Sequence, residues 1–276
     1  MNYRHAFHAG NFADCLKHAL VVWLLRAMQR KATPLRVLDT HAGIGQYDLS
    51  APEAQRTGEW LGGIGRLLDG PEEPALADYL ALVRAAGAPA LYPGSPALVR
   101  ALLRPGDHLL ACELHPEDHA LLRARFRGDA QVAVHLRDAW EALRALTPFP
   151  EKRGLVLVDP PFEQEGEFDR MAAGVALVNH RFRAAVQACW YPIKHRAPVR
   201  AFHAALKDSG VRDIVAAELW LREPTDPTRL NGCGLLVVNP PWQFEAEGGA
   251  MLAALLRRLG NREVGEGSAM LRIADE

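Results

Sequence analysis

The fold is decided by the stretch Val37-Leu38-Asp39-Thr40-His41-Ala42-Gly43-Ile44-Gly45, a short aliphatic run that ends in an acid and a glycine turn. Open α/β sheets bind ligands beyond the carboxyl ends of their strands, at the point where the strand order reverses. Because Gly43 and Gly45 have no side chains, they would let a ligand approach the backbone closely; a side chain at either position would block that approach. No third glycine follows at the GxGxxG spacing, and no phosphate-binding loop of the GxxxxGK type is present, so neither a pyrophosphate nor a nucleoside triphosphate is favoured. Taken alone, the stretch equally fits an ordinary turn.

Short aliphatic or β-branched runs alternate with helical stretches along the chain. This alternation predicts an α/β fold with a mostly parallel, Rossmann-like sheet and helices on both faces. The last two runs are joined by a loop without helical periodicity, so we expect an antiparallel pair at the sheet edge. A long helix is expected before the first strand, with Asn11 as its N-cap. The seven predicted strands are 36–39, 108–113, 131–136, 154–158, 186–190, 212–221 and 233–239.

One interval is much longer than a nucleotide-binding unit needs. Seventy-four positions separate Asp39 from Glu113, whereas the ribose-binding carboxylate normally lies ~20 residues after the glycine loop. The surplus of about 50 residues matches 46–92, which carries two helical patterns around the breaker Gly70-Pro71. We therefore expect a single domain over 1–276, with 46–92 as a small helical insertion subdomain above the carboxyl edge of the sheet.

The composition is that of an ordinary globular chain: of 276 residues, 49% are hydrophobic and 24% are charged. Intrinsic disorder, collagen and a disulfide scaffold are thereby excluded. The longest apolar run, Ala19–Leu25, is far shorter than the ~20 residues of a membrane span, and four scattered cysteines fit a reducing compartment. We expect a cytoplasmic protein with no membrane partner. A net charge of −1, from 32 basic and 33 acidic residues, argues against a grip on nucleic acid by bulk electrostatics.

Acids follow the second and third predicted strands as well as the first. Glu113 can take both hydroxyls of a ribose, and Asp138 can meet an adenine amine. Each acid alone equally fits a helix N-cap, but three at successive strand ends favour a nucleoside site. Gly94-Ser95-Pro96 begins the helix after the insertion, where exposed amides and the Ser95 hydroxyl suit a carboxylate. A plain helix start with proline in the first turn explains the same residues.

The motif Asp159-Pro160-Pro161-Phe162 follows a buried aliphatic strand directly. Because proline fixes φ, Asp159 and the Pro160 carbonyl form a preorganised pair of hydrogen-bond acceptors. Two such acceptors can bind both hydrogens of an exocyclic amine and free its lone pair for attack, while Phe162 can stack on a base. A turn after a strand is the alternative explanation.

A second copy, Asn239-Pro240-Pro241-Trp242, follows the last predicted strand. We assign the chemistry to Asp159, because its strand is expected next to the glycine-turn strand at the switch point. Asn239 is expected to end an edge strand, too far from that point, and to be structural.

With these motifs the chain resembles S-adenosylmethionine-dependent adenine-N6 methyltransferases, whose hallmark is (Asp/Asn)-Pro-Pro-(Tyr/Phe/Trp). The opening Tyr3-Arg4-His5-Ala6-Phe7-His8-Ala9-Gly10-Asn11, followed by Ala13-Asp14 and Leu16-Lys17-His18, is similar to the RlmJ family of 23S ribosomal RNA adenine-N6 methyltransferases. Tyr92-Pro93-Gly94-Ser95-Pro96, Glu113-Leu114-His115-Pro116 and Trp190-Tyr191-Pro192 resemble that family too. The resemblance covers essentially the whole chain.

The resemblance implies a class I methyltransferase fold and S-adenosylmethionine as cofactor. Ser95 would bind the methionine carboxylate, Glu113 the ribose and Asp138 the adenine, beside Ala139, where the family often has glycine. Asp159 would be the catalytic acceptor and would also border the cofactor. The remaining residues carried over are Lys17, His18 and His41 in the cofactor pocket, and Tyr3, His5, Pro160 and Phe162 on the substrate.

The implied partner is 23S ribosomal RNA, with its target adenine exposed in a loop or flipped out, because a stacked base cannot reach such a pocket. The same motif also serves DNA adenine-N6 and protein glutamine-N5 methylation, and a non-catalytic nucleotide-sensing scaffold is the alternative from another class. No metal is expected, because His5 and His8 have no partner ligands at a recognisable spacing. Candidate contacts to the RNA backbone are Arg4, Lys17, Arg181, Arg183 and 194–196, each otherwise a solvated charge.

Overall fold

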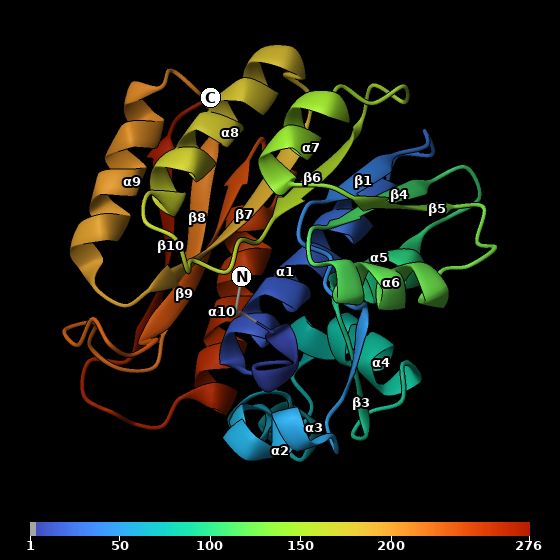
Figure 1. Ribbon diagram of the computed structural model, residues 1–276. Helices are drawn as coiled ribbons and strands as arrows, with labels where there is room; N and C mark the ends of the chain where they lie inside the picture. The colour runs from blue at the N-terminus through green and yellow to red at the C-terminus, as the bar shows by residue number, and fades with distance from the viewer. Residues whose placement is uncertain (1–3) are drawn as a thin grey trace.

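The computed structural model describes residues 4–276, which form a central sheet with helices on both faces (Figure 1). The α/β class and the mostly parallel core predicted from the sequence are confirmed. The strand order is β10-β8-β9-β7-β6-β1-β4-β5. The strands are β1 (Arg36–Asp39), β4 (His108–Glu113), β5 (Val132–Leu136), β6 (Gly154–Val158), β7 (Val186–Ile193), β8 (Ile214–Trp220), β9 (Gly232–Val238) and β10 (Gly267–Ala274).

Strand β1 lies at the centre of the parallel part of the sheet. Leu38 pairs with Leu110 of β4 on one side and with Val156 of β6 on the other, parallel in both cases. The chain therefore leaves β1 towards β4 and β5 and later returns to β6 on the opposite side. This reversal of strand order places a switch point at the carboxyl end of β1, where open α/β sheets bind ligands.

The helices cover the two faces of the sheet as two separate hydrophobic cores. Val37 belongs to the core beneath α1 (Phe12–Gln29), α5 (Ser95–Leu102), α6 (Pro116–Arg125) and α10 (Phe244–Leu259). Leu38, which points the opposite way because strand side chains alternate, belongs to the core beneath α7 (Ala139–Ala145), α8 (Glu167–Arg181) and α9 (Arg196–Asp208). The side chain of Asn11 caps α1 by accepting from the N–H groups of Ala13 and Asp14, as predicted.

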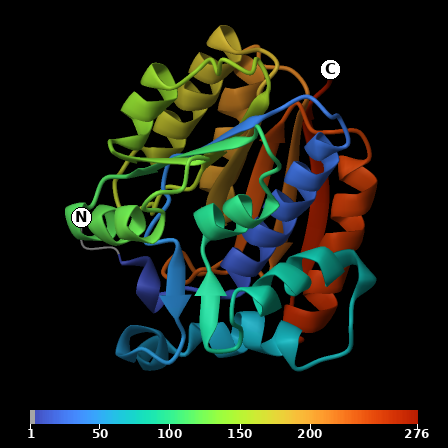
Figure 2. The ribbon, with the colours of Figure 1, turned by 90° about the vertical axis from the view of Figure 1, so that its right-hand side faces the viewer.

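Residues 46–93 leave the sheet and return to it through a two-stranded antiparallel ribbon. Gln46 pairs with Pro93, Tyr47 with Tyr92 and Asp48 with Leu91. The segment packs against α1 and α10 at one end of the molecule (Figure 2). Its elements are β2 (Gln46–Asp48), α2 (Pro52–Thr57), the π-helix η2 (Leu61–Gly65), α3 (Arg66–Leu68), the 3-10 helix η3 (Pro74–Leu76), α4 (Ala77–Ala85) and β3 (Leu91–Pro93). A further 3-10 turn, η1 (His5–Phe7), precedes α1.

Two predictions about the sheet are wrong. The main sheet has eight strands rather than seven, because β10 pairs antiparallel with β8 at the edge. Strand β9 is not at the edge but lies between β7 and β8, antiparallel to both. All seven residues of β9 are buried, which requires neighbours on both sides, whereas the half-exposed β10 tolerates an edge position.

Candidate active site

A cavity of about 890 Å³ lies at the carboxyl ends of the parallel strands. Every site residue predicted from the sequence that the structure describes lines this cavity. Tyr3 lies outside the described residues, so its predicted contact with substrate stays a prediction. The predicted residues that line the cavity are His5, Lys17, His18, His41, Ser95, Glu113, Asp138, Ala139, Asp159, Pro160 and Phe162.

The glycine turn after β1 is tied to the end of β4 by one carboxylate. Glu113 accepts from the N–H of Gly43 through Oε2 at 2.9 Å and from the N–H of His115 through Oε1 at 2.8 Å. Burial raises the pKa of Glu113, and these amide hydrogen bonds oppose that rise. Each oxygen keeps a second lone pair for a ligand hydroxyl. Gly43 has φ of +58°, and a Cβ there would lie 2.2 Å from the hydroxyl of Tyr47. Within the chain, it is thus the Tyr47 side chain that approaches Gly43 closely.

Two other predicted cofactor residues have structural duties of their own. Asp138 caps α7 by accepting from the N–H groups of Trp140 and Glu141, both through Oδ1. Ser95 donates its hydroxyl hydrogen to Oδ2 of Asp39 at 2.6 Å. That hydrogen is therefore already used, and what Ser95 offers a ligand carboxylate is the N–H at the start of α5. Burial raises the pKa of Asp39 to about 6, although the Ser95 hydrogen bond opposes it.

The Asp159 motif leaves β6 beside β1, as predicted. The N–H of Asp159 donates to Nδ1 of His41 at 3.2 Å, so this ring nitrogen acts as an acceptor. Burial lowers the pKa of His41 to about 4, which keeps the ring neutral. Phe162 adopts φ of +52°, a conformation that is rare for a bulky residue and is associated with functional sites. Its ring lies 4.8 Å from that of Phe168 and 6.0 Å from that of Trp190.

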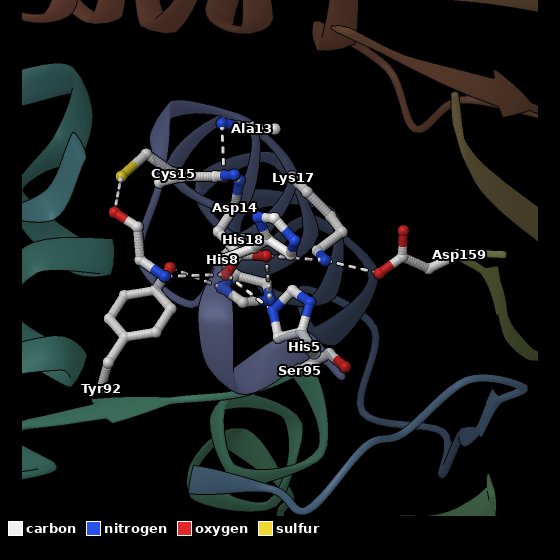
Figure 3. A network of polar contacts seen from close by, with 12 residues as sticks. His5, His8, Ala13, Asp14, Cys15, Lys17, His18, Tyr92, Ser95 and Asp159 are labelled. Atoms are coloured by element: carbon white, nitrogen blue, oxygen red, sulfur yellow. Dashed lines mark hydrogen bonds and ion pairs between the residues drawn. The ribbon is translucent and has the colours of Figure 1, made fainter. Parts of the chain in front are cut away.

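Lys17 joins the Asp159 motif to α1 (Figure 3). Its ammonium lies 2.5 Å from Oδ2 of Asp159 and 2.9 Å from Oδ1 of Asp14. Burial would lower the pKa of Lys17, but the two carboxylates outweigh it and raise that pKa well above its usual value. Lys17 therefore stays charged. Because only 4% of the residue is exposed, the prediction that it contacts the RNA backbone is wrong.

Asp14 is the site residue that sequence reasoning missed. It is 2% exposed, lines the cavity and contacts Lys17, His5 and the N–H of Gly10. The sequence carries two signals: Asp14 belongs to the opening stretch that resembles the family, and it stands three residues before a lysine. Neither signal indicated a role for it in the site. On most helices that spacing marks a solvated face, whereas α1 is buried on nearly all sides.

The second Pro-Pro motif lies at the other end of the strands from Asp159, where the parallel strands begin. Because β9 runs antiparallel to β7, its last residue, Val238, pairs with Gln187 near the start of β7. Asn239 has φ of +52° and donates through Nδ2 to the carbonyls of Arg183 and Ala185. The expectation that Asn239 ends an edge strand is wrong, but its distance from the switch point is as expected.

Replacing Asn239 with alanine should lower the free energy of unfolding by about 2 kcal/mol, because two hydrogen bonds are lost and alanine is strained at positive φ. The kcat of the folded variant should equal that of the wild type. Urea unfolding and initial-rate assays at 25 °C would check both expectations. A loss of kcat without a loss of stability would place Asn239 in the chemistry and contradict the assignment.

Acid should destabilise the protein through two buried neutral histidines. Burial lowers the pKa of His18 to about 3 and that of His41 to about 4, so the unfolded chain binds protons first as the pH falls below the unfolded value of 6.5. Asp39 opposes this loss, because its pKa, raised to about 6, makes the folded state bind a proton first. The two histidines together outweigh this one carboxyl group, so these three groups make the protein less stable as the pH falls from about 6 to about 4.

Urea unfolding at a series of pH values would measure this slope. His18→Gln should make the slope shallower, since one of the two buried histidines that lose stability in acid is removed, whereas replacing the exposed His180 on α8 with glutamine should leave it unchanged. An unaltered slope in His18→Gln would refute the account.

Residues 4–276 contain neither a membrane-spanning helix nor a cluster of metal-binding side chains. No helix there is long and apolar enough to cross a membrane. No group of three or more histidine, cysteine, aspartate or glutamate side chains in the same range is placed to hold a metal ion.

Comparison with known proteins gives consistent matches over most of the chain. The profile of the family described as Ribosomal RNA large subunit methyltransferase D, RlmJ, matches residues 32–271. A protein named Ribosomal RNA large subunit methyltransferase J from Escherichia coli (strain K12) is 38% identical over 251 residues, 90% of each chain. A protein of the same name from Haemophilus influenzae is 36% identical over 264 residues, 94% of each chain. A crystal structure of a Legionella pneumophila protein, 31% identical, has a TM-score of 0.88 and covers 96% of this chain and 98% of that one.

Proposed function

Because the chain belongs to the RlmJ family of ribosomal RNA large subunit methyltransferases, we propose that it methylates N6 of one adenine in 23S ribosomal RNA, with S-adenosylmethionine as methyl donor. One observation carries the proposal beyond family membership. The acceptor pair of Asp159 and Pro160 lines the same cavity as the strand-end acids Glu113 and Asp138. A site for an exocyclic amine thus adjoins a site for a nucleoside.

The residues around the glycine turn fit the cofactor. The cavity, at about 890 Å³, is within the range of small-molecule sites. Glu113 would accept from the ribose hydroxyls, Asp138 would accept from the adenine amine beside Ala139, and the N–H of Ser95 would donate to the methionine carboxylate. Lys17 and the neutral rings of His18 and His41 complete the lining. When bound, S-adenosylmethionine supplies a methyl group already activated by its sulfonium.

On the substrate side, the chain's own residues hold the amine. Lys17 engages Oδ2 of Asp159, which leaves Oδ1 and the Pro160 carbonyl to accept the two N6 hydrogens. This arrangement directs the nitrogen lone pair towards the methyl group and stabilises the positive charge that develops on the nitrogen. Phe162 would stack on the base, with Trp190 beside it.

The target base has to leave any stack before it can enter the cavity. Lys194 and Arg229, both exposed, line its outer part and suit the phosphates flanking a single flipped nucleotide. Tyr3 and His5, ahead of α1, would meet the RNA next to the site. The net charge of −1 is consistent with a local contact of this kind, because a nearly neutral protein has little electrostatic attraction for RNA at long range.

We propose one methyltransferase domain over 1–276, in which 46–92 is the helical insertion subdomain. The ribbon that pairs Gln46 with Pro93 supports this division, because the segment leaves and rejoins the sheet at one place. We also propose that the protein is cytoplasmic and that its partner there is ribosomal RNA.

A methyl-transfer assay with three substrates would test the function: deproteinised 23S RNA, duplex DNA and a protein fraction. We expect transfer to the RNA alone, and mass spectrometry of nuclease fragments should find one N6-methyladenine. Transfer to duplex DNA or to a glutamine amide in place of RNA would overturn the substrate assignment. Binding of S-adenosylmethionine without any transfer would favour a nucleotide-sensing scaffold.

A further inference from the structure

We propose that Asp14 is a positioning residue for the methyl transfer, which holds Lys17 against Asp159 and joins both to the N-terminal turn. The inference rests on the function proposed above. Asp14 uses both carboxylate oxygens: Oδ1 lies 2.9 Å from the Lys17 ammonium, and Oδ2 lies 2.9 Å from Nε2 of His5 and accepts from the N–H of Gly10 at 2.9 Å. Figure 3 shows these contacts as one continuous chain from His5 to Asp159.

Stability alone does not account for this arrangement. Asp14 is buried on α1, a helix whose buried residues are mostly apolar, and a buried ion pair is often no more stabilising than apolar residues of the same size. Burial acts to raise the pKa of Asp14, but His5, Lys17 and His18 outweigh it and keep that pKa well below its usual value. The carboxylate is therefore a permanent negative charge beside a permanent positive one. What it provides is a fixed place for the Lys17 ammonium.

The place of that ammonium determines what Asp159 offers to substrate. Lys17 lies between two carboxylates, so Asp159 shares the cation rather than holding it alone. The ammonium already lies in hydrogen-bond contact with Oδ2 of Asp159, and Asp14 is the partner that fixes it on α1. Without the charge of Asp14, only Asp159 would hold the ammonium, so the ammonium could move and shift the Asp159 oxygens that receive the amine. A shift of about 1 Å in a reacting group can lower a rate by about 10²-fold.

The same carboxylate fixes the turn that would meet the RNA. His5 lies in η1, and its ring packs 5.0 Å from that of Tyr47. Gly10 is held on both sides, because its N–H donates to Asp14 and its carbonyl accepts from the N–H of Ile64 at 2.8 Å. A Cβ on Gly63 would lie 2.1 Å from that carbonyl, so the insertion approaches the turn as closely as a glycine permits. Asp14 therefore connects the N-terminal turn to Asp159 through the ion pairs Asp14–Lys17 and Lys17–Asp159.

The test is a double-mutant cycle on the full chain with 23S RNA as substrate. Asp14→Asn keeps the size and can still accept from Gly10, but it removes the charge. We expect kcat to fall about 10- to 100-fold, while the Kd of S-adenosylmethionine, measured by calorimetry, changes by less than about threefold. In a Lys17→Met background, Asp14→Asn should leave kcat unchanged, because its effect on the chemical step acts through Lys17. An effect through His5 and the N-terminal turn should instead raise the KM for RNA.

Asp107→Asn is the matched control. Asp107 is equally buried and also pairs with an arginine three residues away, but it precedes β4 at the opposite edge of the sheet. The substitution Asp107→Asn should lower the melting temperature and leave kcat unchanged. If Asp14→Asn does not fold, the apolar pair Asp14→Leu with Lys17→Met should fold and have the kcat of Lys17→Met alone.

Effects of Asp14→Asn and Lys17→Met that multiply, or a kcat for Asp14→Asn equal to that of the wild type, would overturn the proposal and leave the proposed function intact. A wild-type protein that binds S-adenosylmethionine but does not methylate the RNA would overturn the proposed function, and this inference with it.

Discussion

Asp159→Asn should lower kcat for RNA methylation by about 10²- to 10⁴-fold, while the Kd of S-adenosylmethionine stays within about threefold. The hallmark motif also occurs with asparagine, but here Lys17 engages one oxygen of Asp159. An asparagine would therefore turn its single oxygen towards Lys17 and present an N–H group towards the amine. Glu113 and Asp138, the proposed cofactor contacts, lie at the end of β4 and at the start of α7, so the substitution should leave them in place. Transfer of a labelled methyl group under single-turnover conditions would give kcat, and calorimetry would give the Kd.

Asn239→Ala serves as the control for this prediction, because it changes the equivalent residue of the other Pro-Pro motif at the far edge of the sheet. Full activity in Asp159→Asn or Asp159→Ala would refute the catalytic assignment. A matching loss of cofactor binding would instead place Asp159 in the cofactor site alone.

Glu113→Ala should weaken S-adenosylmethionine binding by about 10²-fold, because two hydrogen bonds from ribose hydroxyls to a charged group are lost. The Gly43 turn would also lose the acceptor of its N–H group, so part of the effect would come from a looser turn. Calorimetric titration with S-adenosylhomocysteine, which carries no transferable methyl group, would measure the change without turnover.

Glu141→Ala is the matched control for Glu113, since Glu141 is exposed in the first turn of α7 and does not line the cavity. The Kd of S-adenosylhomocysteine for Glu141→Ala should equal that for the wild type. Unchanged binding in Glu113→Ala would mean that Glu113 only supports the turn.

The part of the site that lies at strand ends could be predicted from the sequence. Parallel strands bring their carboxyl ends to one edge, so acids that follow three aliphatic runs have to converge there. Asp39, Glu113 and Asp159 are positioned in this way by β1, β4 and β6.

Strand order beyond β7 could not be predicted in the same way. Nothing local distinguishes a strand that joins the edge from one that enters between two others, and β9 is placed by pairing with residues about 20 and 45 positions earlier. The role of Asp14 was hidden for a related reason. A polar residue on a helix is read as solvated until the packing of that helix is known, and α1 is enclosed by the sheet, the insertion and α10.

The position of β9 has a consequence for synthesis on the ribosome. Strand β8 is translated before β9, yet it cannot join the sheet until β9 lies between it and β7. Until β9 is available, β7 therefore keeps an unpaired edge and β8 has no partner in the parallel part of the sheet. Both strands are rich in apolar residues, and exposed edges of this kind pair readily with other chains. We therefore expect a chain that contains β8 but not β9 to aggregate more readily than the complete chain.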